Sequence, residues 1–201
     1  MTQHKYTVLI VPGLRDHVEE HWQTYLAQNL PNSITVPSLT ENKLDLKARV
    51  EAIQNQVSQI TGPILIVAHS AGVLMTIHWA SRHASNLDTR VIGALLVSPP
   101  DITASWPSQY PSPATLKQNG WSPIPDETLP FAALVVGSTN DYLASFSSVK
   151  NMAENWGCKL HNAGSVGHLN PASGYGEWPQ VFDLIAKVER QVALRKRYNN
   201  S

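Results

Sequence analysis

The segment Ile64-Leu65-Ile66-Val67-Ala68-His69-Ser70-Ala71-Gly72 decides the fold, because an apolar run rich in β-branched residues ends there in a short polar turn. A helix-like segment follows directly. A strand that turns sharply into a helix at a serine is a nucleophile elbow, in which a strained backbone holds the serine Oγ clear of the sheet edge. Small residues must flank this turn because strand and helix approach closely. Gly72 meets that need, and Ala68 exceeds the usual glycine by one methyl group.

Short apolar runs alternate with amphipathic segments along the chain, which is typical of βαβ units and a mostly parallel sheet. Most of the runs are almost continuously apolar, as strands covered on both faces should be. The predicted strands are 7–11, 33–37, 64–68, 91–98, 131–137 and 159–162. The predicted helices are 19–30, 44–60, 71–83, 145–156 and 179–192. We therefore expect residues 1–201 to form one α/β domain, with about six strands and helices on both faces of the sheet.

Residues 99–130 do not fit this alternation. The segment holds eight prolines together with Trp106, Tyr110 and Trp121, and it shows no sustained period. Because it lies between two strong strand predictions, we expect an irregular insertion that serves as a functional loop or a lid. If the insertion roofs the site, Trp106 and Tyr110 indicate an apolar acyl group. In the alternative interpretation these aromatic side chains simply pack the insertion down.

The composition argues against several classes of protein. The formal net charge is zero, and the basic cluster Arg195-Lys196-Arg197 ends a predicted helix, so a nucleic-acid partner is not expected. Cys158 is the single cysteine, which excludes an internal disulfide and indicates a buried small side chain. The N-terminal residues lack a signal-peptide core, and no apolar run approaches the roughly 20 residues that span a bilayer. We expect a cytoplasmic protein without a membrane partner, and its oligomeric state stays open.

Three residues could form a catalytic triad. A serine hydroxyl becomes a nucleophile when a base takes its proton, and a third group must orient that base. The elbow fold places the acid and then the histidine in loops after later strands. Asp141 follows the fifth predicted strand and His168 follows the sixth, so we predict Ser70 as nucleophile, Asp141 as acid and His168 as base. Asp101 is the rival acid, because it follows the fourth predicted strand.

Acyl transfer also needs donors for an oxyanion. The backbone N–H of Ala71, directly after the nucleophile, is one candidate. The other is the N–H of Leu14, in the loop after the first predicted strand, where Gly13 lets the backbone approach closely. Gly13, His69, Trp106 and Tyr110 are the candidate substrate contacts. His69 cannot aim its ring back at Ser70 Oγ from the elbow, so we expect it to pack or to hydrogen-bond.

Longer motifs extend this interpretation over nearly the whole chain. They are Val11-Pro12-Gly13, His21-Trp22-Gln23, Val67-Ala68-His69-Ser70 with Gly72, His78-Trp79-Ala80, Leu96-Val97-Ser98-Pro99-Pro100-Asp101, Leu129-Pro130-Phe131, Ser138-Thr139-Asn140-Asp141, Trp156-Gly157, Gly167-His168-Leu169-Asn170 and Ser173-Gly174-Tyr175-Gly176-Glu177-Trp178-Pro179. In these motifs the sequence resembles the small serine hydrolases of the retinoblastoma-binding protein 9 type, within the α/β-hydrolase superfamily.

The resemblance implies an α/β-hydrolase fold with a minimal cap. It places the nucleophile, acid and base of that family on Ser70, Asp141 and His168, and it implies that Ala68 is normal there. The chain departs from the family at Tyr142, where members often have proline, and at 44–45, where they often have tryptophan. We expect Tyr142 to leave the acid loop looser.

We therefore expect a serine hydrolase that cleaves small carboxylic esters or amides through an acyl-enzyme. The sequence contains no paired-cysteine metal spacing, H-E-x-x-H motif, phosphate-binding loop or dinucleotide fingerprint, so no cofactor or metal is expected. Because a fold does not fix a function, the alternative is a protein-interaction module on a hydrolase scaffold with little or no turnover. An exposed apolar patch around Trp106 and Tyr110 would favour that alternative, and a closed pocket above Ser70 would favour the enzyme.

Overall fold

A six-stranded parallel sheet forms the centre of the protein, in a computed structural model that describes residues 6–16, 18–83 and 90–199. The strand order is β2-β1-β3-β4-β5-β6, and each neighbouring pair runs parallel. The strands are β1 (Thr7–Val11), β2 (Ser33–Thr35), β3 (Ile64–His69), β4 (Val91–Val97), β5 (Ala132–Gly137) and β6 (Lys159–Asn162). The predicted α/β fold with about six strands is confirmed, although β2 ends two residues before its predicted limit.

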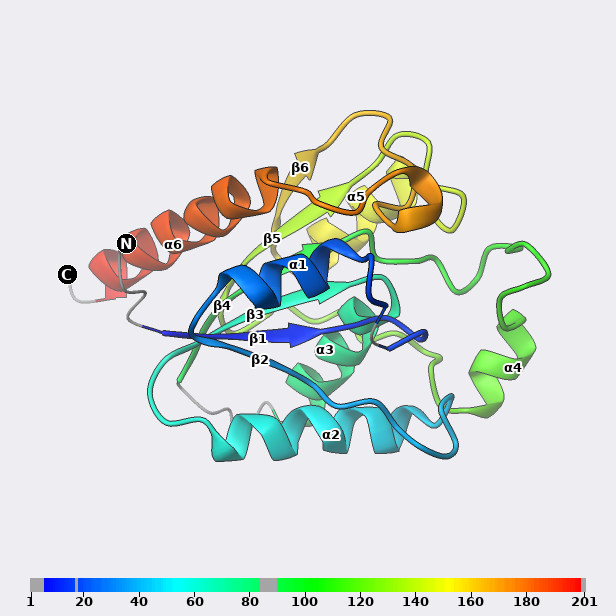
Figure 1. The fold of residues 1–201 in the computed structure, drawn as a ribbon, viewed down its shortest axis with the longest axis horizontal. Helices are drawn as coiled ribbons and strands as arrows, with labels where there is room; N and C mark the ends of the chain where they lie inside the picture. Colours follow the sequence, from blue (N-terminus) through cyan, green and yellow to red (C-terminus); the bar gives the residue numbers. More distant parts are fainter. Residues whose placement is uncertain (1–5, 17, 84–89, 200–201) are drawn as a thin grey trace.

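Helices cover both faces of the sheet (Figure 1). On one face lie α2 (Leu46–Gln59), α3 (Ala71–Arg82) and α5 (Phe146–Asn155), and on the other α1 (Trp22–Asn29) and α6 (Gln180–Asn199). Alternate residues of each strand enter the two layers, because side chains along a strand point to opposite faces. Ile64 and Ile66 pack in the first core, whereas Leu65 and Val67 pack in the second. The continuous apolar runs in the sequence reflect this two-sided burial.

The insertion between β4 and β5 contains a helix that the sequence analysis missed. Helix α4 (Pro113–Gln118) begins after Ser112, whose side chain accepts a hydrogen bond from the Thr115 N–H, and Pro113 occupies its first turn. Leu116 is the buried residue of this helix. One buried residue gives no periodic apolar pattern, so the sequence does not indicate this helix. A 3₁₀ turn, Pro171–Ser173, was also missed, because it contains no buried residue.

Two predicted helix limits were also wrong. Helix α1 starts at Trp22, where the His21 ring caps the helix, and not at residue 19. Helix α6 continues to Asn199, beyond the predicted end at 192. The prediction stopped short because the last turns of the helix carry no apolar stripe. The basic residues 195–197 are exposed near its C-terminus, where the helix dipole favours positive charge, as expected.

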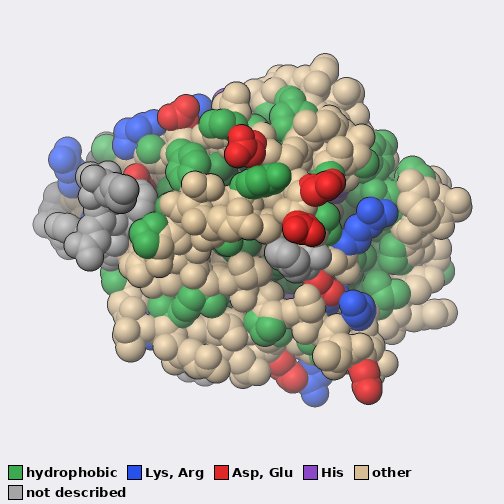
Figure 2. All heavy atoms as spheres, viewed as in Figure 1, with side chains coloured by type: hydrophobic (Ala, Val, Ile, Leu, Met, Phe, Trp, Pro, Cys, Tyr) green, Lys and Arg blue, Asp and Glu red, His purple; other side chains and the backbone are tan. Residues whose placement is uncertain are grey.

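The molecular surface mixes charges of both signs. On the face shown in Figure 2, basic and acidic side chains are interspersed with hydrophobic ones. Across the described residues, no helix combines the length and the apolar character that crossing a membrane requires.

The turn between β3 and α3 brings that helix against the end of β1. Ser70 has φ 56° and ψ −129°, and its N–H donates to the Val97 carbonyl at 2.9 Å. Helix α3 starts at the next residue and is buried through its first ten residues, 71–80. A Cβ atom on Gly72 would lie 2.3 Å from the Val11 carbonyl oxygen and 2.6 Å from that of Pro12. The strained elbow predicted from the sequence is therefore present, and glycine is required at its second helical position.

We predict that Gly72→Ala destabilises the fold by roughly 1–3 kcal/mol, because the added methyl group meets backbone oxygens that cannot rotate away. Urea denaturation at pH 7 would measure the loss. Ser81→Ala, on the same helix but partly exposed, is the matched control and should change the free energy of unfolding by less than about 0.5 kcal/mol. Equal stability of the two variants would contradict the close approach at Gly72.

Candidate active site

Three loops at the carboxyl end of the sheet bring the predicted triad residues together. Ser70 ends β3, Asp141 follows β5 and His168 follows β6. His168 Nε2 lies 2.8 Å from Ser70 Oγ, and His168 Nδ1 lies 2.8 Å from Asp141 Oδ2 and 3.0 Å from its Oδ1. The side chains of His168 and Asp141 are 3% and 1% exposed. In the neutral tautomer that fits these contacts, Nδ1–H donates to the carboxylate and Nε2 accepts the serine proton.

The rival acid, Asp101, has other partners. Its carboxylate accepts hydrogen bonds from the hydroxyl groups of Thr103 and Ser148 and from the Thr103 N–H. Burial alone would raise the pKa of Asp101, but these hydrogen bonds outweigh burial and lower it. Asp101 therefore fixes the start of the insertion and the first turn of α5. Asp141 is the carboxylate that contacts His168.

The acid loop is tied down, and the looser loop expected at Tyr142 is not found. The Leu143 N–H donates to Asp141 Oδ1 at 2.9 Å. The Tyr142 hydroxyl accepts a hydrogen bond from Asn170 Nδ2 at 2.8 Å and lies 3.0 Å from the Tyr110 hydroxyl. Tyr142 thus replaces the rigidity of a proline with contacts to the base loop and to the insertion.

The base loop needs unusual backbone angles, and side chains hold it in them. Gly167 has φ 59° and Leu169 has φ 48°. The Gly167 N–H donates to Asn140 Oδ1 at 2.7 Å, and the His168 N–H donates to Ser173 Oγ at 3.0 Å. A Cβ atom on Gly167 would lie 2.4 Å from that same Ser173 Oγ. Glycine therefore allows both the left-handed turn and the hydroxyl contact that orients the base.

A second set of contacts holds the base loop from the side of α1. His69 Nε2 lies 2.9 Å from the His168 carbonyl oxygen, and because a carbonyl only accepts, Nε2 carries the proton. Trp22 Nε1–H donates to the next carbonyl, that of Leu169, at 2.9 Å. The His69 ring lies between those of His21 and His168, with centroids 4.7 Å and 5.0 Å away. His69 thus packs and hydrogen-bonds as expected, whereas the sequence analysis assigned no site role to His21 or Trp22.

The two neighbouring histidines are uncharged at neutral pH. Burial, with a smaller contribution from His168, lowers the pKa of His21 to about 4. Burial also lowers the pKa of His69 well below its usual value, helped by repulsion from His168 and His21. His168 can therefore take up a proton beside two rings that do not already carry one.

A cavity of about 510 Å³ opens above Ser70. Its wall includes the other site residues that the sequence predicts, which are Gly13, Leu14, His69, Ala71, Trp106, Tyr110 and His168. Trp106 Nε1–H donates to the carbonyls of Asp101 and Leu143, at 2.8 Å and 3.0 Å. The indole thus packs the insertion down, and it also lines the cavity. Trp106 and Tyr110 are half-buried and form no exposed patch.

The turn over residues 13–16 lies beside Ser70 and carries one of the two predicted oxyanion donors, Leu14. A Cβ atom on Gly13 would lie 3.3 Å from Ser70 Cβ, and the Asp16 N–H closes the turn onto the Gly13 carbonyl at 3.0 Å. The Leu14 N–H, inside this turn, has no hydrogen-bond partner among the described residues. Ala71 is the first residue of α3, where N–H groups have no acceptor within the helix. Both predicted oxyanion donors therefore belong to residues that line the cavity, and the structure gives neither N–H a partner among the residues it describes.

A buried ion pair anchors this turn to α2. The Asp16 carboxylate contacts the Arg49 guanidinium, and their side chains are 7% and 5% exposed. Arg49 Nε–H also donates to the Lys43 carbonyl at 2.9 Å, and Lys43 Nζ lies 3.5 Å from Asp16 Oδ2. Asp16 has φ 57° and ends the turn that begins at Gly13. No sequence pattern indicates the role of Arg49, a charged residue that is buried within the amphipathic helix α2.

No cluster of three or more histidine, cysteine or acidic side chains suited to a metal ion occurs in the part of the chain that the structure describes. Cys158 is half-buried after α5, and burial raises the pKa of its thiol to about 12. Cys158 packs against the first core as a small side chain, although it is less buried than the sequence predicts.

Comparisons with known proteins identify a family and several structures with a similar fold. A family model described as "Serine hydrolase" matches residues 8–187. A YdeN-like hydrolase from Pectobacterium atrosepticum SCRI1043 is 26% identical, with a TM-score of 0.78 over 94% of this chain and 92% of that chain. The ydeN gene product of B. subtilis is 19% identical, with a TM-score of 0.69 over 92% of this chain and 99% of its own. No curated protein matches the sequence significantly.

A more distant structure shares the fold alone. Est1E from Butyrivibrio proteoclasticus is 12% identical, with a TM-score of 0.62 over 99% of this chain and 90% of its own.

We predict that acid destabilises the protein through its buried neutral histidines. Between about pH 6.5 and pH 4 the unfolded His21 binds a proton that the folded one does not, so the free energy of unfolding falls as the pH falls. His21→Asn keeps an acceptor at the start of α1 and removes this titration. Urea denaturation at pH 7 and pH 4.5 should show a loss about 2–3 kcal/mol smaller in the variant. Equal losses in both proteins would refute this linkage.

Proposed function

The chain belongs to the serine hydrolase family, and on that premise we propose that it cleaves small carboxylic esters or amides through an acyl-enzyme on Ser70. One observation carries the proposal, the hydrogen-bonded series Ser70 Oγ, His168 Nε2, His168 Nδ1 and Asp141 Oδ2, with both contacts at 2.8 Å. The cavity above Ser70 supports an enzyme over an interaction module.

In the first step, Ser70 Oγ bonds to the carbonyl carbon of the substrate while its proton passes to His168 Nε2. The carbonyl π pair moves onto oxygen, and the resulting oxyanion accepts hydrogen bonds from the N–H groups of Ala71 and Leu14. Asp141 holds the imidazolium in the correct orientation and stabilises its charge. Each of these groups is preorganised by a contact to another loop, so little rearrangement accompanies the reaction.

In the second step, the oxyanion pair returns to the carbonyl and the bond to the leaving alkoxide or amine breaks. The leaving group takes its proton from His168 Nε2, which leaves an ester on Ser70 Oγ. Water then attacks this ester while His168 accepts a water proton. Collapse of the second tetrahedral intermediate releases the carboxylic acid and returns the proton to Ser70.

Within the family, we assign the chain to the retinoblastoma-binding protein 9 type. The motif residues of that resemblance support the assignment, because several of them lie around the proposed site. Gln23 Nε2 donates to the carbonyls of Val11 and Val67, at 3.3 Å and 3.2 Å, which joins α1 to the two central strands. Trp178 packs edge-on against Trp22, with ring centroids 5.2 Å apart.

Ser70→Ala should abolish hydrolysis of p-nitrophenyl esters, with a fall in kcat on the order of 10⁴-fold or more, because no other group can carry the acyl chain. The same variant should lose labelling by a fluorophosphonate probe. Ser147→Ala removes an exposed hydroxyl outside the cavity and is the control that should keep both activities. Retained hydrolysis in Ser70→Ala would contradict the proposal.

Asp141→Asn tests the acid. We expect kcat to fall by about 10⁴-fold, because an amide neither fixes the histidine tautomer nor stabilises the imidazolium. Asp101→Asn is the matched control, and we expect it to lower stability while kcat stays within about 10-fold of wild type. Steady-state kinetics on one p-nitrophenyl ester would decide, and the reverse ranking would show that Asp101 is the acid.

A further inference from the structure

Arg15 lies on the wall of the cavity and has no counter-charge. Aside from histidine, the charged residues that line the cavity are Arg15 and Asp16. The Asp16 carboxylate is compensated by Arg49 and by Lys43. The exposed Arg15 side chain makes no ion pair or hydrogen bond with any residue that the structure describes. The wall of the cavity therefore carries a positive charge that forms no ion pair with the residues that the structure describes.

The backbone position of Arg15 is fixed with respect to the nucleophile. It follows Leu14 in the turn that starts at Gly13, beside Ser70, and ends at Asp16. Asp16 and Arg49 form a buried ion pair. Because separating the pair would leave a buried charge without its partner, which costs free energy, this contact opposes movement of the turn. The backbone of Arg15 is thus held in place within this turn, on the wall of the cavity.

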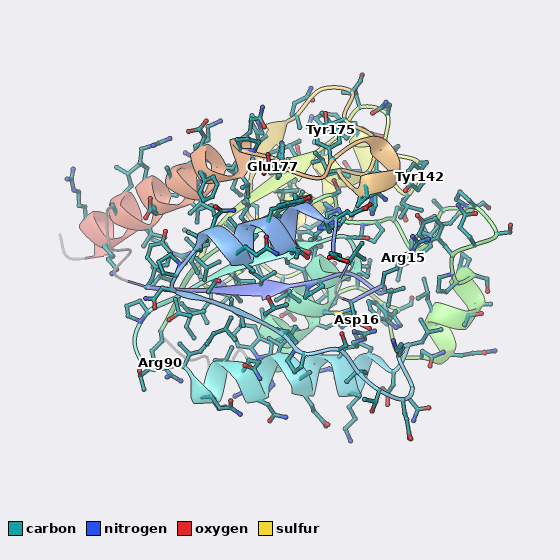
Figure 3. The ribbon with its side chains drawn as sticks, in the orientation of Figure 1. Arg15, Asp16, Arg90, Tyr142, Tyr175 and Glu177 are labelled. Atoms are coloured by element: carbon teal, nitrogen blue, oxygen red, sulfur yellow. The ribbon has the colours of Figure 1, made fainter. Side chains whose placement is uncertain are left out.

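Arg15 and Tyr110 both lie on the wall of the cavity, and the Tyr110 hydroxyl lies 3.0 Å from that of Tyr142. Burial, the contact with Tyr142 and the Asp141 carboxylate raise the pKa of Tyr110, whereas the charge of Arg15 acts in the opposite direction. The Tyr142 ring lies 5.5 Å from the His168 ring, centroid to centroid. Figure 3 shows Arg15 and Tyr142 at the same end of the molecule. Because the proposed leaving group takes its proton from His168 Nε2, the alcohol portion of an ester would lie on the side of His168 where these two tyrosines are.

The remaining wall of the cavity favours apolar groups. It includes side chains from β1, α1 and the insertion, among which are Ile10, Val18, Ala27, Leu44 and Pro100. An acyl chain in this region would bury apolar surface with no charged group opposing it. The wall of the cavity thus combines apolar side chains with one unpaired cation, Arg15, and the phenol of Tyr110.

We propose that the enzyme prefers esters with an apolar acyl group and a carboxylate on the alcohol portion, and that Arg15 and the Tyr110 hydroxyl bind this carboxylate. A guanidinium matches a carboxylate with two parallel N–H donors, and a phenol adds a third. The preference rests on the proposed hydrolase function. Since Arg15 is exposed, solvent screens the contact, and we expect an effect of about 5- to 10-fold in kcat/KM.

The test compares 4-carboxyphenyl butanoate with its neutral analogue, 4-(methoxycarbonyl)phenyl butanoate. Arg15→Gln should lower kcat/KM for the carboxylate ester by about 5- to 10-fold and leave the neutral ester within about 2-fold, and Arg15→Glu should lower the carboxylate ester further. Lys47→Gln removes one exposed positive charge from α2 and is the control for overall charge. Thermal denaturation of each variant checks that it is folded. Added salt should weaken the wild-type preference.

The outcomes separate the two proposals. Equal ratios of the two esters in wild type and Arg15→Gln, with hydrolysis that depends on Ser70, would overturn the carboxylate site alone. The same fall in Lys47→Gln would overturn it as well, because the effect would then be one of net charge. If wild type hydrolyses neither ester, the hydrolase proposal fails together with the preference that rests on it.

Discussion

The site depends on the contact between the first turn of α3 and the end of β1. Gly72 allows the two backbones to meet, and their approach forces Ser70 into a conformation that non-glycine residues rarely adopt. Such a conformation costs on the order of 1–3 kcal/mol and persists only where the surroundings determine it. Here they do, because β3 is buried on both faces and α3 is buried along most of its length. The core thus supplies the free energy that holds the serine above the sheet.

The same logic extends to the loops that carry the other site residues. Asp16 and Leu169 also have positive φ, and each is held by a contact from another part of the chain. Arg49 of α2 holds Asp16, and Trp22 of α1 holds the carbonyl of Leu169. Helices from opposite faces of the sheet therefore position opposite sides of one site. A parallel sheet makes this possible, since all of its strands end at the same edge.

The sequence was sufficient for the sheet, the helices with a periodic apolar face and the three residues at the strand ends. Those features depend on local pattern and on the order of elements, both of which can be seen in one chain. The ion pair of Asp16 with Arg49 and the ring series from His21 to His168 could not be predicted, because they join residues that are distant in sequence and have no shared period. Tyr142 was misjudged for a related reason. The absence of a proline was evident, but its hydroxyl contacts with Tyr110 and Asn170 depend on the packing of three loops.

The neighbours of His168 suit the role of base that we propose for it. Asp141 would stabilise an imidazolium at one ring nitrogen, while His21 and His69 stay neutral because burial lowers their pKa. A charged His69 would repel the imidazolium at a centroid separation of 5.0 Å and would raise the barrier to proton transfer. Burial of these rings lowers stability in acid, since the unfolded chain can protonate them. Burial of His21 and His69 thus favours proton transfer to His168, but the same burial makes the protein less stable in acid.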